Sequence, residues 1–357
     1  MKILFFQTAF LGDLLLSSVF LKNLRLAYPD AEIHLAARGK FAEFFKEFSL
    51  VDRAWSVNKK DKKSLAILIS SLKKENFDLV FCPHESFRSA SICGKLNAAQ
   101  SFSFRRWFSS FFFNRLVTRP MDLPDVLRQT ALLAAANQEF GVKWVDFVSK
   151  YRGSESQVLS DFSESRVQIP EFLKMHLKLP DERISLLLKN FDLPSEYICI
   201  APGSVWETKK WREEHYVQFA KNRSEKIIVL GGPGEESLCE RISQQIPGSL
   251  NLAAKTSLVE LYAILTKAKF LVCNDSGTMH MASCANCPSI ANFGPTTLDI
   301  GYRPWSNNSL VNQIELSCRP CGKHGHDKCP IGTHQCMKDL LPSQVEAKSQ
   351  LFQSLNS

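Results

Sequence analysis

The sequence lacks several features that define a protein class at once. No apolar run in its 357 residues approaches the roughly 20 residues that a membrane-spanning helix needs. No G-x-G-x-x-G motif follows the first predicted strand, and no P-loop is present. These absences disfavour an integral membrane protein, a dinucleotide-dependent oxidoreductase and a P-loop ATPase.

The basic residues form no long run, and no recognised nucleic-acid-binding module appears, so no nucleic-acid partner is expected. The net charge of +8 lies in the first half: residues 1–180 hold 26 Lys and Arg against 18 Asp and Glu, whereas residues 181–357 hold 18 of each. The first half is therefore the expected contact for an anionic partner, although a modest positive balance also aids solubility.

The 11 cysteines do not indicate a secreted disulfide framework, which would be shorter and even-numbered. Three of them sit in strand-like apolar runs and are predicted to be small core residues: Cys82, Cys199 and Cys273. The apolar start of the chain resembles a signal peptide, but Gln7 and Asp13 interrupt it and no clean cleavage site follows. We interpret residues 1–6 as the first strand of a cytoplasmic protein.

Short apolar runs alternate with helical patterns along the chain, which predicts βαβ units and parallel sheets. Strands are expected at 1–6, 31–36, 54–57, 77–82, 197–201, 226–230, 270–273 and 288–293, and helices at 14–27, 41–48, 64–75, 124–140, 171–190, 258–268 and from residues 213 and 278 onward. Residues 151–170 are expected to form a loop. The prediction is an α/β protein with domains at 1–180 and 181–340, followed by a C-terminal helix within 341–357 that returns to the first domain.

The stretch from Phe270 to Ser283 is the centre of the functional interpretation. A buried strand, a turn and a helix follow one another there, which places free backbone N–H groups and a positive helix end at the edge of a sheet. Such an edge suits a phosphate. Four polar side chains would lie beside it: Asp275, Ser276, Thr278 and His280. The alternative is an ordinary α/β turn with a capping aspartate.

A similar turn follows the first predicted strand. Gly12 would let the chain approach a ligand closely, and Asp13 would be exposed at the edge of the sheet, where a carboxylate can act as a base. The structural alternative makes Asp13 the N-cap of the helix predicted at 14–27.

Polar groups also follow two other predicted strands of the second half. Ser204, Thr208 and Lys209 come after the strand at 197–201, and Glu235 and Glu236 come after the strand at 226–230. A lysine, hydroxyls and backbone N–H groups fit a diphosphate, and an acid at a strand end fits ribose hydroxyls. The sequence therefore predicts a nucleotide held through its diphosphate by the second domain, facing a first domain that exposes an aspartate.

The segment from Ser101 to Arg115 interleaves aromatic residues with arginines. This composition suits a membrane–water interface or a lipid-bearing substrate. It also suits a buried strand and helix with arginines at the rim, and we favour this core interpretation.

Several motifs occur together in a known order: Gly12-Asp13-Leu-Leu-Leu, Pro202-Gly-Ser with Lys209-Lys-Trp211, Gly231-Gly-Pro-Gly-Glu-Glu, and Asp275-Ser-Gly-Thr-Met-His280 with Phe293-Gly-Pro-Thr296. In this combination the sequence resembles the ADP-heptose:lipopolysaccharide heptosyltransferase family over nearly its whole length. The resemblance implies a GT-B architecture, with two Rossmann-like domains whose parallel sheets face a central cleft. It also implies an inverting, metal-independent transfer of heptose from ADP-heptose to the lipopolysaccharide inner core, of the heptosyltransferase II type, with no required cofactor.

The resemblance assigns a role to each motif. Asp13 is implied to be the general base, and Lys209 is implied to stabilise the departing diphosphate. The other implied donor-site residues are Ser204, Thr208, Ser276, Gly277 and Thr278 beside the phosphates, Asp275 and His280 as a pair, Glu235 or Glu236 at the ribose, and Thr256 against the adenine. The expected partners are an ADP-sugar and the anionic lipopolysaccharide core, with peripheral contact at the cytoplasmic face of the inner membrane.

The sequence departs from the family pattern at three places. Arg212 and Thr278 replace prolines of the family, and a proline shortly after the Gly-Asp pair is replaced by Ser18 or Val19. None of these changes removes a chemical group. Two alternatives stay open: a GT-B transferase for another nucleotide sugar or acceptor, and a catalytically inactive GT-B-like binding protein. The presence of both Asp13 and Lys209 argues against the second.

Four cysteines near the C-terminus have the spacing of a structural zinc site: Cys318, Cys321, Cys329 and Cys336. Reduced loop thiols or an oxidisable pair would have the same spacing. Cys284 and Cys287 precede a predicted strand and are expected to pack in the core.

Overall fold

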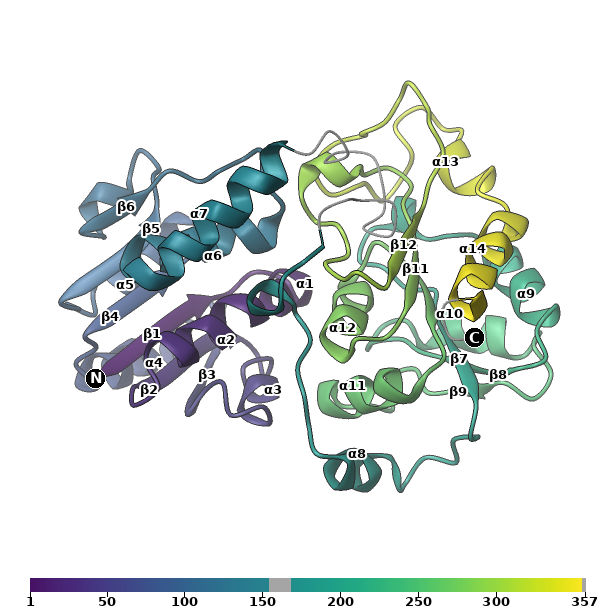
Figure 1. The fold of residues 1–357 in the computed structure, drawn as a ribbon, viewed down its shortest axis with the longest axis horizontal. Coiled ribbons are helices and arrows are strands. Elements are labelled where there is room, and N and C mark those ends of the chain that lie inside the picture. Colours follow the sequence, from purple (N-terminus) through teal and green to yellow (C-terminus); the bar gives the residue numbers. More distant parts are fainter. Residues whose placement is uncertain (154–167, 355–357) are drawn as a thin grey trace. The chain divides into compact units, whose positions relative to one another are not determined.

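The computed structural model describes residues 1–153 and 168–354 (Figure 1). The chain divides into two compact units, Met1–Gly153 with Pro170–Leu173, and Ser154–Ile169 with Lys174–Ser357. Each unit contains one six-stranded parallel sheet with helices packed on it, which confirms the predicted α/β class. Most of the loop expected at 151–170 lies outside the described residues, and residues 151–153 end a helix instead.

The first sheet has the strand order β3-β2-β1-β4-β5-β6. Its strands are β1 Lys2–Gln7, β2 Glu32–Arg38, β3 Arg53–Val57, β4 Leu79–Cys82, β5 Gln100–Phe104 and β6 Arg115–Val117. The helices of this unit are α1 Leu11–Leu16, α2 Ser18–Ala27, α3 Glu43–Lys46, α4 Lys62–Lys74, α5 Phe87–Gly94, α6 Asp125–Ala136 and α7 Gln138–Gly153, with short 3₁₀ turns η1 Ser109–Phe111 and η2 Glu171–Leu173. The strands predicted in this half are therefore confirmed.

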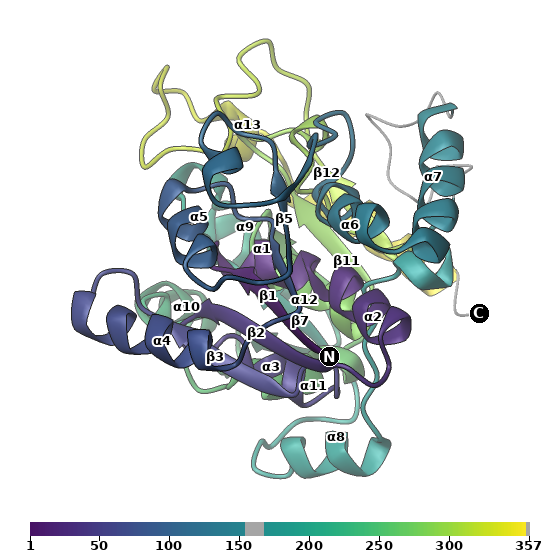
Figure 2. The same cartoon turned by 90° about the vertical axis from the view of Figure 1, so that its left-hand side faces the viewer.

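The alternation of β1 explains how helices cover both faces of this sheet. Leu4 and Phe6 belong to a core cluster that includes residues of α4 and α5. Phe5 points to the opposite face, where its ring lies 4.5 Å from that of Phe20 on α2. Accordingly, α4 and α5 lie on one side of the sheet and α2 and α6 on the other (Figure 2).

The second sheet has the strand order β12-β11-β10-β7-β8-β9. Its strands are β7 Tyr197–Ala201, β8 Lys226–Val229, β9 Leu250–Asn251, β10 Leu271–Asn274, β11 Ser289–Asn292 and β12 Ser309–Asn312. The helices are α8 Asp181–Leu188, α9 Glu213–Lys221, α10 Glu236–Ser243, α11 Leu258–Lys267, α12 Gly277–Ala285, α13 Gln335–Lys338 and α14 Pro342–Ser354, with 3₁₀ turns η3 Glu207–Lys209 and η4 Leu298–Ile300.

Helix α14 is the predicted C-terminal helix, but it does not join the first unit as expected. Val345 and Phe352 are buried in the core cluster of the second unit, beside Ile198 of β7. The helix also contacts α9, and Arg223 donates to Glu346 at 2.7 Å. Helix α14 therefore belongs to the second unit, because these two apolar side chains are buried in its core.

Three helix predictions need correction. The helix expected at 124–140 is interrupted, because the extended backbone of Asn137 separates α6 from α7. The helix expected at 14–27 is two helices, and the first begins at Leu11 with Phe10 at its N-cap, so the interpretation of Asp13 as an N-cap is wrong. In the helix expected at 171–190, only Glu171–Leu173 and Asp181–Leu188 are helical. Within the described residues, no helix is both long and apolar enough to cross a membrane.

Both sheets follow the same connectivity, which is the strand order 3-2-1-4-5-6 of a dinucleotide-binding fold. The order reverses between β1 and β4 in the first sheet and between β7 and β10 in the second. Ligands of such sheets bind beyond the carboxyl ends of the strands at these switch points. The loops after β1, β4, β7 and β10 are therefore where a functional site is expected.

Candidate functional site

A buried ion pair marks the switch point of the second sheet. Lys209, at the end of η3, donates to the carboxylate of Asp275, which follows β10, over 2.6 Å. Thr296 donates to the same oxygen at 2.7 Å. Lys209 is 9% exposed and Asp275 is 5% exposed, so both charges pay a desolvation cost. Such a pair is weak evidence for a role in stability and better evidence for a role in binding.

Asn274 holds the two loops of this switch point together, and sequence reasoning missed it. Its amide oxygen accepts from the backbone of Trp211 at 2.9 Å and from the Tyr216 hydroxyl at 3.1 Å. Its amide nitrogen donates to the carbonyl of Pro202 at 2.8 Å. The side chain therefore ties the end of β10 to the loop after β7. The only signal in the sequence was a polar residue at the end of an apolar strand.

Helix α12 begins at this edge and presents its N-terminus there. Ser276 occupies the N-cap position without capping the helix, and within the described residues its buried hydroxyl oxygen has no hydrogen-bond partner. Gly277 and Thr278 form the first turn, and His280 is buried one turn further. An N-terminus of this kind binds an anion through its free N–H groups and its dipole.

The two candidate ribose acids have different surroundings. Glu235 is half-buried and accepts from the backbone of Gly232 at 2.8 Å. It also lies against Gly203, because a Cβ added to that glycine would come within 2.1 Å of the Glu235 carboxylate. Glu236 is exposed and accepts from the backbone of Gly234 at 2.7 Å. Glu235 is thus the acid that borders the turn after β7, which also carries the buried Ser204.

Thr208 is bound by a segment more than a hundred residues away. Its backbone N–H donates to the carbonyl of His326 at 3.0 Å, and its hydroxyl donates to the same carbonyl at 2.8 Å. The hydroxyl also accepts from the His326 N–H at 2.8 Å, and the His334 ring lies 2.8 Å from the Thr208 carbonyl. The Thr208 hydroxyl, predicted to contact a phosphate, is therefore engaged by residues 318–336, which we call the cysteine loop.

The cysteine loop does not hold a preassembled metal site. Among the described residues, Glu32, His34 and Glu75 form the one group of three whose ligand atoms all lie within 4.8 Å of one another. Lys2 and Arg53 already bond to these carboxylates, so this group is an ion-pair network. No three sulfurs of the cysteine loop, a described segment, meet the same spacing. Zinc binding there stays a prediction, and metal analysis of the purified protein tests it.

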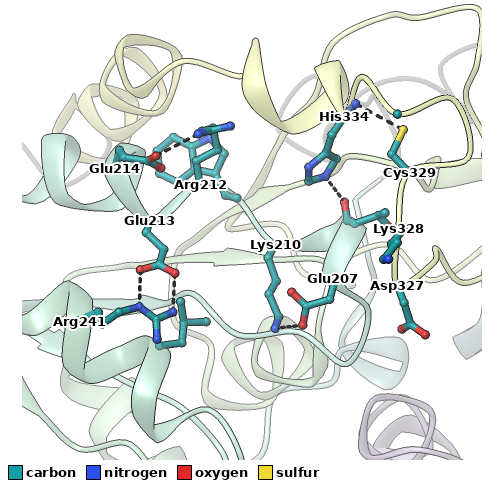
Figure 3. Close-up of a pocket in the computed structure, with 14 residues that line it drawn as sticks. Glu207, Lys210, Arg212, Glu213, Glu214, Arg241, Asp327, Lys328, Cys329 and His334 are labelled. Carbon is teal, nitrogen blue, oxygen red and sulfur yellow. Dashed lines mark hydrogen bonds and ion pairs between the residues drawn. The ribbon is translucent and has the colours of Figure 1, made fainter.

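A cavity of about 610 Å³ lies beside the cysteine loop (Figure 3). Its lining includes Thr208 and Cys329, but not Asp275 or Ser276. Most of its charged side chains are paired with one another, including Arg241 with Glu213, Arg212 with Glu214 and Lys210 with Glu207 (Figure 3). Because its charges neutralise each other, the cavity is a poorer anion site than the switch point.

Thr256, the residue implied to contact the adenine, lies just before helix α11. It is half-buried and directly precedes Ser257, the N-cap of α11, whose hydroxyl accepts from the backbone of Glu260 at 3.3 Å. The capping box fixes the start of α11 and with it the position of Thr256.

Asp13 lies in the first turn of α1, at the switch point of the first sheet. Asp13, which the sequence predicted to be exposed, is half-buried. Burial of its carboxyl group, followed by the charge of Asp125, raises its pKa to about 7. A carboxyl group with this pKa is ionised in about half of the molecules at neutral pH and can take up a proton.

A buried polar network holds the helix that carries Asp13. Gln129 on α6 donates to the Asp13 carbonyl at 3.1 Å and to Asp125 at 2.7 Å, and it accepts from Ser17 at 2.6 Å. Arg119 pairs with the opposite oxygen of Asp125 at 2.5 Å. The network fixes the backbone of Asp13 from α6 and places a second carboxylate near it.

A second polar cluster at this edge was not predicted from the sequence. Three residues converge on Ser89: Lys59 donates to its hydroxyl at 2.6 Å, Ser86 donates at 3.0 Å, and His84 Nδ1 lies 2.7 Å away. Thr8 lies 3.0 Å from the same ring nitrogen. These residues follow β1, β3 and β4, so the fold gathers them although the sequence separates them. We call them the Lys59–His84 cluster.

The surroundings of this cluster are electropositive. Burial, followed by the positive charges of Lys59, Arg38 and Arg119, lowers the pKa of His84 to about 4. Burial lowers the pKa of Lys59 to about 8. At neutral pH the cluster therefore combines a neutral histidine, hydroxyl groups and a charged lysine, which suits an anionic ligand.

The chain as a whole is similar to known proteins. The chain is 28% identical over 372 residues to lipooligosaccharide heptosyltransferase 2 of Campylobacter jejuni, with 99% of each protein covered. It is 24% identical over 364 residues to lipopolysaccharide heptosyltransferase 2 of Salmonella typhimurium, covering 97% of this chain and 96% of that protein.

The fold is similar to that of an ADP-heptose lipopolysaccharide heptosyltransferase II from E. coli, with a TM-score of 0.77, 22% sequence identity and 100% of both chains covered. This likeness confirms the GT-B fold class. The model of glycosyltransferase family 9 (heptosyltransferase) matches residues 65–330, more than half of the chain. The chain therefore belongs to glycosyltransferase family 9, the heptosyltransferases.

Proposed function

We propose that this glycosyltransferase transfers heptose from ADP-heptose to the lipopolysaccharide inner core, with inversion at the anomeric carbon and without a metal ion. Full-length similarity to proteins named heptosyltransferase 2 supports this choice of reaction. The observation that carries the mechanism is the position of Asp13, a carboxyl group in the first turn of α1 at the switch point of the first sheet, whose backbone is held by Gln129. Its pKa, raised to about 7, suits a group that accepts a proton at neutral pH.

The second unit is proposed to bind the donor. The N-terminus of α12, with the buried hydroxyl of Ser276, is the proposed seat of the diphosphate, and Lys209 and Ser204 lie on the same edge. Glu235 is assigned to the ribose because it borders the turn after β7, whereas Glu236 faces solvent. Thr256 is assigned to the adenine by family resemblance. On ADP-heptose binding, the Lys209–Asp275 pair would rearrange so that the ammonium group meets a phosphate.

The first unit is proposed to bind the acceptor and to supply the base. Asp13 takes the proton of the acceptor hydroxyl as its oxygen bonds to the anomeric carbon of heptose. The bond between that carbon and the diphosphate oxygen breaks, and ADP leaves with the electron pair. Lys209 and the N-terminus of α12 stabilise the charge that develops on the leaving diphosphate, so the step itself draws on no metal.

The Lys59–His84 cluster is the proposed contact for an anionic group of the acceptor. Lys59 offers charge, and three hydroxyls offer donors within hydrogen-bond reach of one another. The cluster lies at the same sheet edge as Asp13, because its residues follow strands β1, β3 and β4. The inner core carries such anionic groups, which also fits the positive balance of residues 1–180.

Incubation of the purified protein with ADP-heptose and a truncated core acceptor tests the proposal. Mass spectrometry should show an acceptor heavier by one heptose, together with released ADP. If the protein transfers sugar only from another nucleotide sugar, ADP-heptose is not its donor. If it binds ADP but transfers sugar from none of the donors tested, it is an inactive binding protein. NMR of the product's anomeric centre reports whether the configuration is inverted.

A further inference from the structure

Three large aromatic side chains stand exposed at the carboxyl edge of the first sheet. Phe87, after β4, is 56% exposed, and Trp107 and Phe111, after β5, are 81% and 77% exposed. The rings of Phe87 and Trp107 both contact the buried Phe108, with centroids 5.5 and 5.4 Å apart. We call Phe87, Trp107 and Phe111 the aromatic rim.

The core interpretation of this segment holds only for part of it. Phe102, Phe104, Phe108 and Phe113 are buried as expected. The aromatic rim is not, although such side chains carry large apolar surfaces that folding normally removes from water. A group of exposed aromatics marks a surface that has a use other than packing within its own unit.

Positive charge surrounds the aromatic rim. Between Ser86 and Met121 the sequence holds six Lys and Arg and no Asp or Glu. Four of these arginines are exposed, on or near the same loops: Arg88, Arg105, Arg106 and Arg115. Glu85, directly before this segment, pairs with Arg119 and lies 4.0 Å from Arg106, so it neutralises part of this charge. Aromatic side chains that project among an excess of arginines match the headgroup region of a bilayer that contains anionic lipids.

We infer that the aromatic rim and its arginines form a docking surface for an anionic membrane. The aromatic side chains would enter the headgroup region, and the arginines would contact lipid phosphates. Each arginine held near an anionic surface strengthens binding by about fivefold, and salt weakens this contribution.

The position of the surface connects it to the acceptor, and this part of the inference rests on the proposed function. Asp13 follows β1, the Lys59–His84 cluster follows β1, β3 and β4, and the aromatic rim follows β4 and β5. Because β1, β4 and β5 are neighbours in the sheet, all three groups share one edge of one unit. An acceptor anchored in a bilayer by its lipid would meet the base at the face that touches the membrane.

The test measures binding of the full-length protein to vesicles by cosedimentation. The vesicles contain phosphatidylcholine alone or with about a third phosphatidylglycerol. We expect binding only to the anionic vesicles, a loss of at least about tenfold in W107S/F111S, and a loss of similar size in R105S/R106S that high salt reproduces in the wild type. The matched control I67S/V142S removes two apolar side chains that are 68% and 66% exposed elsewhere in the unit, and it should bind within about twofold of the wild type.

Two outcomes overturn the inference. If the wild-type protein does not bind anionic vesicles, the surface is not a membrane-docking site. If W107S/F111S binds them as well as the wild type does, the aromatic rim is not the contact. Dimerisation or RNA binding that disappears in W107S/F111S, without vesicle binding by the wild type, would assign the surface to that partner instead.

Transfer to a lipid-free acceptor separates this inference from the proposed function. W107S/F111S should retain wild-type turnover on such an acceptor, because neither residue belongs to the proposed site. If the protein binds vesicles but transfers no heptose, the docking surface is supported and the proposed reaction is refuted. If it transfers heptose but does not bind vesicles, the proposed reaction is supported and the docking surface is refuted.

Discussion

Replacing Asp13 by asparagine tests the proposed mechanism most directly, because the change removes a proton acceptor and keeps the shape of the side chain. A positioned base contributes about 10²- to 10⁴-fold to the rate. We therefore expect turnover to fall by roughly this factor, equivalent to about 3 to 5 kcal/mol of barrier. The affinity for ADP should stay within about twofold, because Asp13 lies in the first unit and the proposed donor contacts lie in the second.

The raised pKa of Asp13 also predicts a pH profile for the wild type. With a pKa of about 7, the carboxylate is the proton acceptor in about a tenth of the molecules at pH 6 and in about nine tenths at pH 8. The kcat/KM value should therefore rise across this range and level off above it. In D13N, the residual kcat/KM value should not rise between pH 6 and pH 8.

Stability should change in the opposite direction from activity. The folded-state pKa of Asp13 lies above its ordinary value of 3.8, so between about pH 4 and 7 the folded state binds more protons than the unfolded state. The Asp13 contribution therefore lowers stability as pH rises through this window, by at most about 4 kcal/mol, and less where solvent reaches the group. D13N should accordingly be more resistant to urea than the wild type at pH 8, although its turnover is lower.

Steady-state kinetics, calorimetric ADP titration and urea unfolding at pH 6 and 8 measure these three effects. Asp30→Asn, which changes an exposed aspartate of the same unit, is the control and should behave as the wild type. Turnover above about a tenth of the wild-type value in D13N would refute the assignment of the base. A wild-type profile that is flat between pH 6 and 8 would refute the role of the raised pKa.

Four further substitutions separate the proposed roles. Lys209→Met should lower kcat by about 100-fold or more and weaken ADP binding, measured by calorimetry, because it removes charge from the leaving group and leaves Asp275 buried without its partner. Glu235→Gln should raise the KM for ADP-heptose by about tenfold, whereas Glu236→Gln should leave it unchanged; equal effects would contradict the ribose assignment. Lys59→Met should raise the KM for a phosphorylated acceptor by about tenfold and leave the KM for ADP-heptose unaltered, and a shift in the donor KM alone would place the cluster in another role.

Most of the fold could be predicted from local patterns because most strands of the sheets are short apolar runs followed by turn residues. The runs at β1, β7 and β10 are the clearest, and they precede the three loops that carry Asp13, Lys209 and Asp275. The strands β6 and β9, of three and two residues, are too short to give a pattern. Strand β12 was not predicted because polar residues stand at both of its ends. The family motifs then supplied roles that periodicity alone does not.

The groups that could not be predicted from the sequence consist of residues that are distant in the chain and come together only in the folded protein. Lys59, His84 and Ser89 come from different loops, and only the strand order brings them within hydrogen-bond distance. The raised pKa of Asp13 depends on burial and on Asp125, which is more than a hundred residues away. The exposure of Trp107 could not be read from a segment whose other phenylalanines are buried.

The attachment of Thr208 to the cysteine loop has a consequence for the position of Lys209. Gly325, with φ +87°, brings the loop so close that an added Cβ would lie 3.1 Å from the Thr208 hydroxyl, and Lys209 is the next residue. A deletion or an exchange of amino acids among residues 318–336 would thus shift Thr208 and, with it, the neighbouring Lys209, although residues 318–336 lie more than a hundred positions further along the chain. The length and packing of the cysteine loop therefore help to set where the lysine that pairs with Asp275 lies.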